Sequence, residues 1–192
     1  MPKPSIYVVK FGGSLLSSKS LHSWMALLPT WAQDKSVVLV PGGGEFADVV
    51  RTAQSIEGFD DKRAHALALD AMDRCASVLT AIASASLKRC SLKQLAAVDN
   101  ASDIRLWVPS VEEFRLSGMA EDWSVTSDSI ALWLTSYLEA GNLVLLKMIP
   151  PPTPDPFSWS QHEYVDDYFS TLLATVNCDV KAVCDYRDLR NL

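Results

Sequence analysis

The sequence has few cysteines, no long hydrophobic run and no excess of basic residues. The cysteines at positions 75, 90, 178 and 184 form no CxxC pair, so we expect reduced thiols in a cytoplasmic protein rather than a disulfide framework. No apolar stretch reaches the roughly 18 residues that span a bilayer. The apolar run at residues 5–9 is too short for a signal-peptide core, and we expect no membrane association.

The balance of basic and acidic residues argues against a nucleic-acid-binding protein. With 17 basic and 23 acidic residues the formal net charge is -6, so the chain lacks the general basic footprint of a nucleic-acid binder. A local basic site for a phosphate is still compatible with this balance. The histidines and cysteines show no metal-ligand spacing, and we predict no protein-held metal. The 192 residues, 48% of them hydrophobic, suit one domain over residues 1–192.

Short β-branched runs alternate with longer helical stretches along the chain. The runs are apolar on both faces, which predicts an α/β fold with a mainly parallel sheet covered by helices on each side. Ligands in such folds bind at the carboxyl ends of the strands. The predicted strands are 6–9, 37–40, 95–98, 106–108, 143–146 and 180–183, and the predicted helices are 21–32, 46–56, 64–82, 128–140 (ended by Gly141) and 165–176.

Two glycine clusters follow the first two predicted strands. Lys10 ends the first strand and precedes Gly12, Gly13 and Ser14. Glycines let backbone N–H groups face an anion, and a lysine adds a point charge, so this turn predicts a phosphate site. The alternative is an ordinary strand-to-helix turn.

The second cluster consists of Gly42, Gly43 and Gly44, which follow a buried strand and open a helix. A tight turn needs one or two glycines, so a third indicates close approach of a ligand to the backbone near a helix N-terminus. This loop has the fingerprint of neither a P-loop nor a dinucleotide-binding turn.

A polar cluster opens a later helix at residues 122–131, Asp-Trp-Ser-Val-Thr-Ser-Asp-Ser-Ile-Ala. Helix capping by Thr126 or Ser127, with Asp128 favourable to the helix dipole, accounts for part of it. An aspartate in the first turn could equally orient a catalytic lysine.

Together these three segments resemble the amino acid kinase superfamily. Members have a Lys-x-Gly-Gly-Ser turn, a Gly-Gly-Gly loop and an x-Asp-[Thr/Ser]-x-Ala helix start, and all three occur here in that order. The resemblance implies a three-layer, carbamate kinase-like fold and an ATP-dependent kinase with Mg²⁺ on the phosphates. It implies that Lys10, with Asp128 holding the lysine ammonium groups, is catalytic. It assigns the ATP phosphates to Gly12, Gly13, Ser14 and Ser127, and the acceptor to Gly42, Gly43 and Gly44.

The sequence departs from this family after residue 147. Larger members supply a second lysine from a downstream segment, whereas here residues 150–156 are proline-rich and no such lysine follows. We therefore expect a core at 1–147 and a shortened nucleotide-side segment at 148–192. Lys147, at the end of a buried strand, is the nearest replacement for the missing lysine; the alternative is a strand-end lysine that reaches solvent.

Two more residues are candidates on the acceptor side. Arg51, in the helix after the triple glycine, could hold an acceptor phosphate, or could be an exposed helical arginine. His65, at the start of the long helix, faces the same region and is a candidate ligand of the acceptor; the alternative is a histidine that binds nothing.

Four segments carry a narrower resemblance: Gly-Gly-Gly-x-Phe-Ala-Asp at 42–48, Ala-His at 64–65, Trp-x-Val-Thr-Ser-Asp-Ser-Ile-Ala at 123–131 and Leu-Leu-Lys at 145–147. Together they resemble a short branch of the superfamily, the (aminomethyl)furanyl-methyl phosphate kinases of methanofuran biosynthesis. This resemblance implies a small-molecule acceptor that already carries a phosphate, so no strong general base is needed. The superfamily resemblance also implies a homo-oligomer. The alternatives are a non-catalytic oxyanion-binding or storage protein on the same fold, and a regulatory subunit.

Overall fold

The computed structural model describes residues 5–83, 87–95 and 104–192. Its centre is a six-stranded sheet in the order β3-β4-β2-β1-β5-β6, and every pair of neighbouring strands is parallel. The strands are β1 (Ile6–Phe11), β2 (Ser36–Pro41), β3 (Leu87–Arg89), β4 (Ile104–Leu106), β5 (Asn142–Leu146) and β6 (Asp179–Val183).

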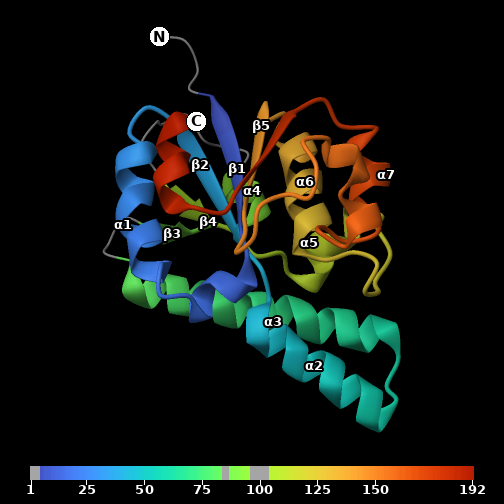
Figure 1. Cartoon of the computed structure of the whole chain (residues 1–192). Coiled ribbons are helices and arrows are strands. Elements are labelled where there is room, and N and C mark those ends of the chain that lie inside the picture. Colours follow the sequence, from blue (N-terminus) through green and yellow to red (C-terminus); the bar gives the residue numbers. More distant parts are fainter. Residues whose placement is uncertain (1–4, 84–86, 96–103) are drawn as a thin grey trace.

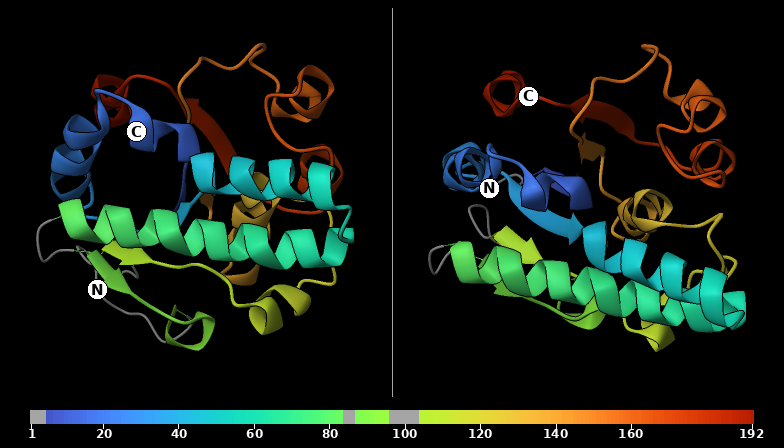
Figure 2. Two further views of the ribbon diagram at one scale, coloured as in Figure 1. Left: turned by 90° about the horizontal axis from the view of Figure 1, so that it is seen from below. Right: turned by 60° about the horizontal axis from the view of Figure 1, so that its bottom comes forward.

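Helices cover both faces of this sheet (Figure 1). They are α1 (Leu21–Trp31), α2 (Gly44–Glu57), α3 (Asp61–Ile82), α4 (Leu92–Leu95), α5 (Val111–Arg115), α6 (Ser127–Tyr137) and α7 (Phe169–Leu173). Short 3₁₀ turns lie at η1 (Gly13–Ser17), η2 (Pro156–Ser158), η3 (Ser160–His162) and η4 (Tyr186–Asn191). Helix α1 lies on one face, and α6 and α7 lie on the other. Figures 1 and 2 show α2 and α3 side by side beyond the carboxyl ends of the central strands.

The core follows from the alternation of side chains along each central strand. Val8 of β1 packs in the cluster formed with α6 and α7, whereas Val9 packs in the cluster formed with α1. Val38 and Leu39 of β2 divide between the two clusters in the same way. Both faces of these strands are therefore buried against apolar side chains, which is why the strands form continuous apolar runs in the sequence. The predicted three-layer α/β fold with a mainly parallel sheet is confirmed.

Several predicted elements differ from the structure. Leu95 closes the short helix α4, and residues 96–98 of the strand predicted there lie outside the described residues. The strand predicted at 106–108 is β4, which ends at Leu106. The helix predicted at 165–176 is confined to α7, because the backbone N–H of Tyr168 bonds the carbonyl of Ser124 instead of continuing a helix (N···O 3.1 Å).

Helix α6 also ends earlier than predicted. Its last residue is Tyr137, and the left-handed residue after it is Glu139 (φ 50°) rather than Gly141. The backbone N–H of Ala140 then bonds the carbonyl of Thr135 at 2.9 Å, so this turn is closed without glycine. Among the described residues, no helix is both long and apolar enough to cross a membrane.

Candidate active site

Three neighbouring strands bring the predicted residues to one edge of the sheet. Strand β1 lies between β2 and β5, with Lys10 paired in register with Val40 on one side and Leu145 on the other. Because all three strands run the same way, the turn after β1, the glycine loop after β2 and Lys147 after β5 meet at their carboxyl ends.

The two glycine loops touch each other through their backbones. A Cβ added to Gly13 would lie 2.1 Å from the Gly44 nitrogen, and one added to Gly42 would lie 2.8 Å from the Gly13 nitrogen. Gly43 is closed off by the Cβ of Ala47 at 2.6 Å, and Gly44 has a φ of 51°. Packing of the chain thus gives each of the three glycines of the second loop a structural reason, beside the predicted approach of a ligand to their backbone.

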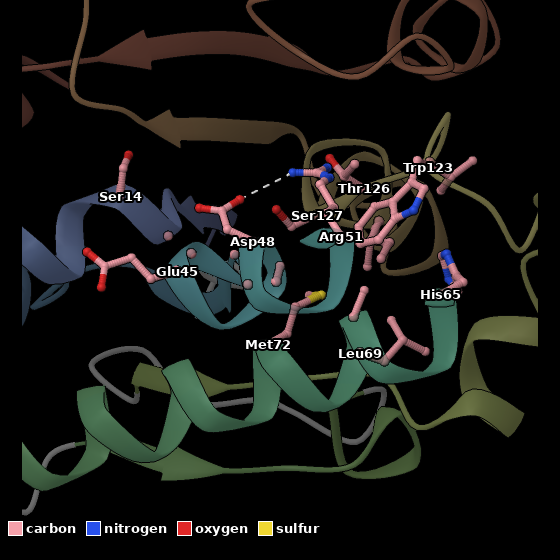
Figure 3. Close-up of a pocket in the computed structure, with 18 of the residues that line it drawn as sticks. Ser14, Glu45, Asp48, Arg51, His65, Leu69, Met72, Trp123, Thr126 and Ser127 are labelled. Carbon is pink, nitrogen blue, oxygen red and sulfur yellow. Dashed lines mark ion pairs between the residues drawn. The ribbon is translucent and has the colours of Figure 1, made fainter. Parts of the chain in front are cut away.

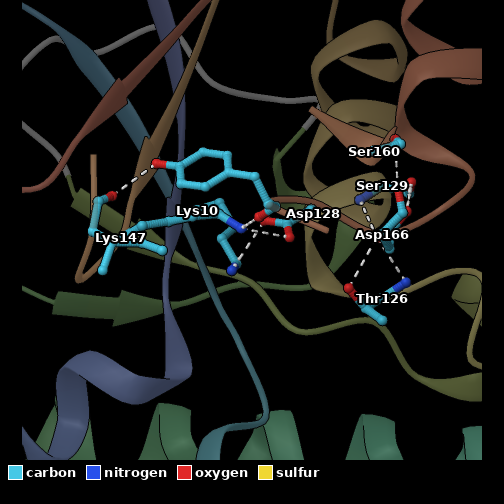
Figure 4. A network of polar contacts seen from close by, with 9 residues as sticks. Lys10, Thr126, Asp128, Ser129, Lys147, Ser160 and Asp166 are labelled. Atoms are coloured by element: carbon cyan, nitrogen blue, oxygen red, sulfur yellow. Dashed lines mark hydrogen bonds and ion pairs between the residues drawn. The ribbon is translucent and has the colours of Figure 1, made fainter. Parts of the chain in front are cut away.

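Lys10, Asp128 and Lys147 form one buried charge cluster (Figure 4). The Lys10 ammonium lies 3.0 Å from Asp128 Oδ1, and the Lys147 ammonium lies 2.9 Å from Oδ2. Lys147 also donates to the backbone carbonyl of Tyr164 and lies 4.6 Å from the centre of its ring. The three charged side chains are 7%, 7% and 14% exposed for Lys10, Asp128 and Lys147. One carboxylate therefore orients two ammonium groups.

Burial and the neighbouring charges shift the pKa values of Asp128 and Lys147. Burial alone would raise the pKa of Asp128, but the adjacent Lys10 and Lys147 ammonium groups hold that pKa below its usual value. Burial, together with the positive charge of Lys10, lowers the pKa of Lys147 against the opposing effect of Asp128. Asp128 is thus an anion at neutral pH, engaged as a counter-ion and unsuited to act as a general base.

Lys10 lines two cavities. The larger of these two, with a volume of about 410 Å³, opens between α2, α3 and the start of α6 (Figure 3). Its floor is formed by Lys10 and the two glycine loops, and its outer walls include the acidic side chains of Glu45 and Asp48. Leu69, Met72 and other apolar side chains from α3 and α6 line the rest. The cavity therefore combines a cationic, backbone-rich floor with apolar and acidic walls.

Arg51 and Trp123 form the far wall of the larger cavity. The guanidinium carbon of Arg51 lies 4.2 Å from the centre of the Trp123 ring, and an Arg51 nitrogen lies 3.5 Å from Asp48. Trp123 is fixed in turn by a 2.6 Å hydrogen bond from its indole N–H to Gln54. Arg51 is thus an exposed helical arginine, with 49% of its side chain accessible, that also stacks on an aromatic face beside the cavity.

His65 lines the same cavity from the first turns of α3. It is 4% exposed, and its Nδ1 lies 3.2 Å from the carbonyl oxygen of Asp122. A carbonyl only accepts, so Nδ1 carries the proton of this bond. Nε2 is buried and has no hydrogen-bond partner within the described part of the chain. Burial lowers the pKa of His65, so the neutral ring dominates at neutral pH.

A smaller cavity of about 280 Å³ lies on the other side of Lys10. Lys147 and the residues after it form one wall, and Glu163 and Tyr164 form another. Lys10, Gly13 and Ser14 line both cavities. Lys10 thus lies at the junction of two compartments, an arrangement suited to passing a group from a molecule in one to a molecule in the other.

Comparison with known proteins identifies the family. The family model described as the amino acid kinase family matches residues 5–150. The chain belongs to the amino acid kinase family. It is 30% identical over 143 residues to the (5-(aminomethyl)furan-3-yl)methyl phosphate kinase of Methanocaldococcus jannaschii. That match covers 73% of this chain and 64% of the relative, less than two thirds of its length.

Solved structures of other family members share the fold. The uridylate kinase of Archaeoglobus fulgidus matches with a TM-score of 0.72 at 14% identity, over 96% of this chain and 93% of that one. The UMP kinase of Ureaplasma parvum matches with a TM-score of 0.61 at 14% identity, over 94% and 89% of the two chains. At this identity the likeness shows the amino acid kinase fold alone.

The structure brings together the site residues predicted from the family resemblance. Arg51, His65 and the triple glycine line the larger cavity, and Gly12 and Lys147 line the smaller one. Ser127, predicted to contact ATP phosphates, lines the larger cavity, next to Gly42. Lys147 does not extend freely into solvent, because Asp128 and the Tyr164 carbonyl hold its ammonium.

Sequence reasoning missed other residues of this family site. Glu45 and Asp48 precede the predicted Arg51 by six and three residues and so share one face of α2 with it, a signal that could have been used. Trp123 and Asp166 had no such signal. Trp123 bonds Gln54, 69 residues earlier, and Asp166 bonds residues 37 and 40 positions before it.

Proposed function

We propose that this protein transfers the terminal phosphoryl group of ATP to a small acceptor that already carries a phosphate. The observation that carries the proposal is the position of Lys10 between two cavities, with its ammonium held by Asp128. The curated kinase relative and the family assignment support a phosphotransferase.

The proposed reaction places one substrate in each cavity. The ATP phosphates lie in the smaller cavity against Gly12, Gly13 and the two lysines, and the acceptor phosphate lies in the larger one. An acceptor oxygen forms a bond to the terminal phosphorus while the bond to the bridging oxygen breaks and ADP leaves. Lys10, at the junction, stabilises the charge that the transferring group carries, and Lys147 stabilises the charge left on ADP.

Magnesium fits this site as a companion of ATP. The described residues contain no group of three or more His, Cys, Asp or Glu side chains able to hold a metal. Mg²⁺ retains several waters and commonly binds through substrate phosphates and one or two carboxylates, so the ATP oxygens would supply its main ligands. When bound it would neutralise phosphate charge that the two lysines leave uncompensated.

The larger cavity favours a small, phosphorylated, ring-containing acceptor. A phosphate oxygen is already anionic, which suits a site whose central carboxylate is engaged with two lysines and cannot take up a proton. Leu69, Met72 and Trp123 offer apolar walls to a flat ring, and Asp48 offers a carboxylate to a positive group. The acceptor named in the curated relative, (5-(aminomethyl)furan-3-yl)methyl phosphate, has these three parts.

The test is a turnover assay with purified protein, Mg-ATP and paired acceptors. ADP release and ³¹P NMR would follow the reaction of the furan phosphate, of its unphosphorylated alcohol and of UMP. We expect a diphosphate product from the furan phosphate and little from the other two. Tight Mg-ATP binding without transfer to any acceptor would contradict the proposal and favour a non-catalytic oxyanion-binding or regulatory role.

We extend the proposal to assembly and location. Helix α2 buries no residue and leaves Phe46, Val49 and Ile56 exposed, an apolar face that supports a homo-oligomer. The four cysteines are free thiols, which supports a reducing, cytoplasmic location. We also retain the division into a core at 1–147 and a nucleotide-side segment at 148–192.

Acceptor binding is expected to be coupled to proton uptake at His65. Nδ1–H bonds Asp122, so Nε2 can donate to a phosphate only in the imidazolium, whereas burial keeps the free ring neutral at pH 7. Acceptor affinity should therefore rise as pH falls from 8 to about 6.5, by at most about tenfold per pH unit for one proton. Calorimetry in two buffers of different ionisation enthalpy measures the uptake.

A variant of His65 tests whether it is the group that takes up this proton. His65→Gln should abolish the uptake. Equal uptake in the wild type and His65→Gln would show that the proton binds elsewhere.

The alkaline limb of turnover is expected to depend on Lys147. Its pKa is lowered by burial and by Lys10, so the ammonium is lost at a lower pH than the roughly 10.4 of a free lysine. Lys147→Arg keeps the charge and should shift the fall in kcat to higher pH. Lys181→Arg, on the exposed surface of β6, is the matched control. Identical pH profiles for Lys147→Arg and the wild type would exclude Lys147 from this role.

A further inference from the structure

The N-terminus of α6, which carries Asp128, is capped by a residue from the far end of the chain. Thr126 occupies the N-cap position, but its side chain makes no capping bond. Instead Asp166 Oδ2 accepts the backbone N–H of Thr126 at 2.9 Å, its hydroxyl at 2.9 Å and the backbone N–H of Ser129 at 3.0 Å. Asp166 Oδ1 accepts the hydroxyl of Ser129 (Figure 4).

These four bonds fix the residues on either side of the catalytic candidates. Thr126 and Ser129 are held by Asp166, and Ser127 and Asp128 lie between them in the same turn. Ser127 lines the larger cavity and Asp128 pairs with the lysines. A rotation of this turn would therefore move Asp128 relative to both ammonium groups, and Asp166 resists that rotation.

The loop that bears Asp166 also holds Lys147. The Tyr164 carbonyl accepts from the Lys147 ammonium, and the Tyr164 hydroxyl donates to the carbonyl of Ile149 at 3.1 Å. Two residues later, the Asp166 carbonyl accepts the Ser160 hydroxyl at 2.8 Å, which fixes the loop itself. One three-residue stretch thus binds both the replacement lysine and the helix that carries its counter-ion.

We propose that Asp166 is a positioning residue that sets the geometry of the Asp128–Lys147 pair for phosphoryl transfer. The inference rests on the proposed function and assigns to the shortened C-terminal segment the task of aligning the charge cluster. Asp166 lines neither cavity, so it acts on α6 through Thr126 and Ser129, and on Lys147 through its charge, but not on a substrate. Burial and the negative charge of Asp128 raise the pKa of Asp166, which is consistent with a carboxyl retained for its bonds to α6.

The test compares Asp166→Ala with Asp166→Asn and with Asp155→Ala. Asp155 is an exposed capping residue of the same C-terminal segment, where its side chain accepts the N–H of Phe157. Assays run well below the melting temperature of each variant. We expect Asp166→Ala to lower kcat about tenfold or more, with KM values changed less than about threefold, because a misaligned group costs turnover rather than binding.

The asparagine variant and the control define the alternatives. Asparagine keeps an acceptor oxygen and should restore kcat to within about threefold of the wild type, and Asp155→Ala should retain full turnover. A kcat for Asp166→Ala within threefold of the wild type would overturn the proposal. Should Asp166→Ala not fold, Ser129→Ala, which removes one buried hydroxyl donor, is expected to lower kcat severalfold, and an unchanged kcat there would overturn it.

A second readout separates this inference from the proposed function. Amide hydrogen exchange at residues 127–130 should accelerate in Asp166→Ala and not in Asp155→Ala, whether or not the acceptor has been identified. Faster exchange with no wild-type turnover on any acceptor would leave the capping role intact and count against the kinase. Unchanged exchange in Asp166→Ala would overturn the role of Asp166 itself.

Discussion

Replacing Lys10 with Met is expected to lower kcat about 10²–10³-fold, the cost of one donor that stabilises charge in the transition state. Met preserves the bulk of the side chain and removes its charge at the junction of the two cavities. Asp128 keeps Lys147 as a partner, so no anion is left unpaired and we expect a melting temperature close to that of the wild type. Initial rates with saturating Mg-ATP measure the effect.

A second lysine provides the matched control for this substitution. Lys35 is also partly buried and paired, with Asp34 at 3.0 Å, but it lies before β2, at the opposite edge of the sheet. Lys35→Met should keep full turnover. A folded Lys10→Met protein with turnover within threefold of the wild type would remove Lys10 from the mechanism.

Asp128→Asn should lose at least as much turnover and, unlike Lys10→Met, should also be less stable. The substitution removes the shared counter-ion of two buried ammonium groups, which then repel each other without compensation. Leaving buried charge unpaired costs on the order of 3 kcal/mol. ATP binding should persist, since the phosphates can replace the lost carboxylate as the partner of both lysines. Differential scanning calorimetry and ATP titration measure the two effects.

The loss of stability in Asp128→Asn should depend on pH in a defined direction. A lysine whose pKa is lower in the folded state than in the unfolded state reduces the stability of the fold. The full loss of stability applies below the folded-state pKa, and it vanishes as pH rises to about 10.4, where the unfolded lysine also loses its proton. The lowered pKa of Asp128 stabilises the wild type above about pH 4, and this benefit is lost as pH falls through the folded value. The difference between the two proteins should therefore be largest near neutral pH.

Asp60→Asn is the matched control for the aspartate. Asp60 is an exposed N-cap of α3 that accepts the N–H of Arg63 at 2.7 Å, a role that Asn fills equally well. It should retain both stability and turnover. If Asp128→Asn behaves like Asp60→Asn, Asp128 contributes only to the first turn of α6, and the link between the charge cluster and catalysis is broken.

The central fold could be predicted because its signals are local. Strands β1, β2 and β5 are short apolar runs buried on both faces, and α3 shows a clear helical period. The outer elements of the fold were harder to predict. Strand β3 has exposed residues and no apolar pattern, so nothing in its sequence marks it. Helix α5 carries a capping box of Ser110 and Glu113, a signal that could have been used.

In the candidate site, too, residues with a local sequence signal could be predicted and residues without one could not. Lys10, the glycine loops and Asp128 follow directly after buried strands or open a helix, so their convergence follows from strand direction. The sequence could suggest that Lys147 pairs with Asp128 but could not establish it, because the pairing depends on the path of the loop that supplies the Tyr164 carbonyl. Asp166 and Trp123 could not be found at all, since their contacts join segments far apart in sequence.

The backbone contact between Gly13 and Gly44 constrains how this protein can diverge. A Cβ on Gly13 would meet the Gly44 nitrogen at 2.1 Å, and one on Gly44 would meet the Gly13 oxygen at 2.9 Å. A side chain gained on either loop cannot be accommodated by a smaller residue on the other, because both are already glycine. Substitutions at Gly13 and Gly44, next to the cavity floor, are therefore excluded on both loops. Changes in what the larger cavity binds would have to arise on its outer walls, at positions such as Arg51 and Trp123, while its floor stays unchanged.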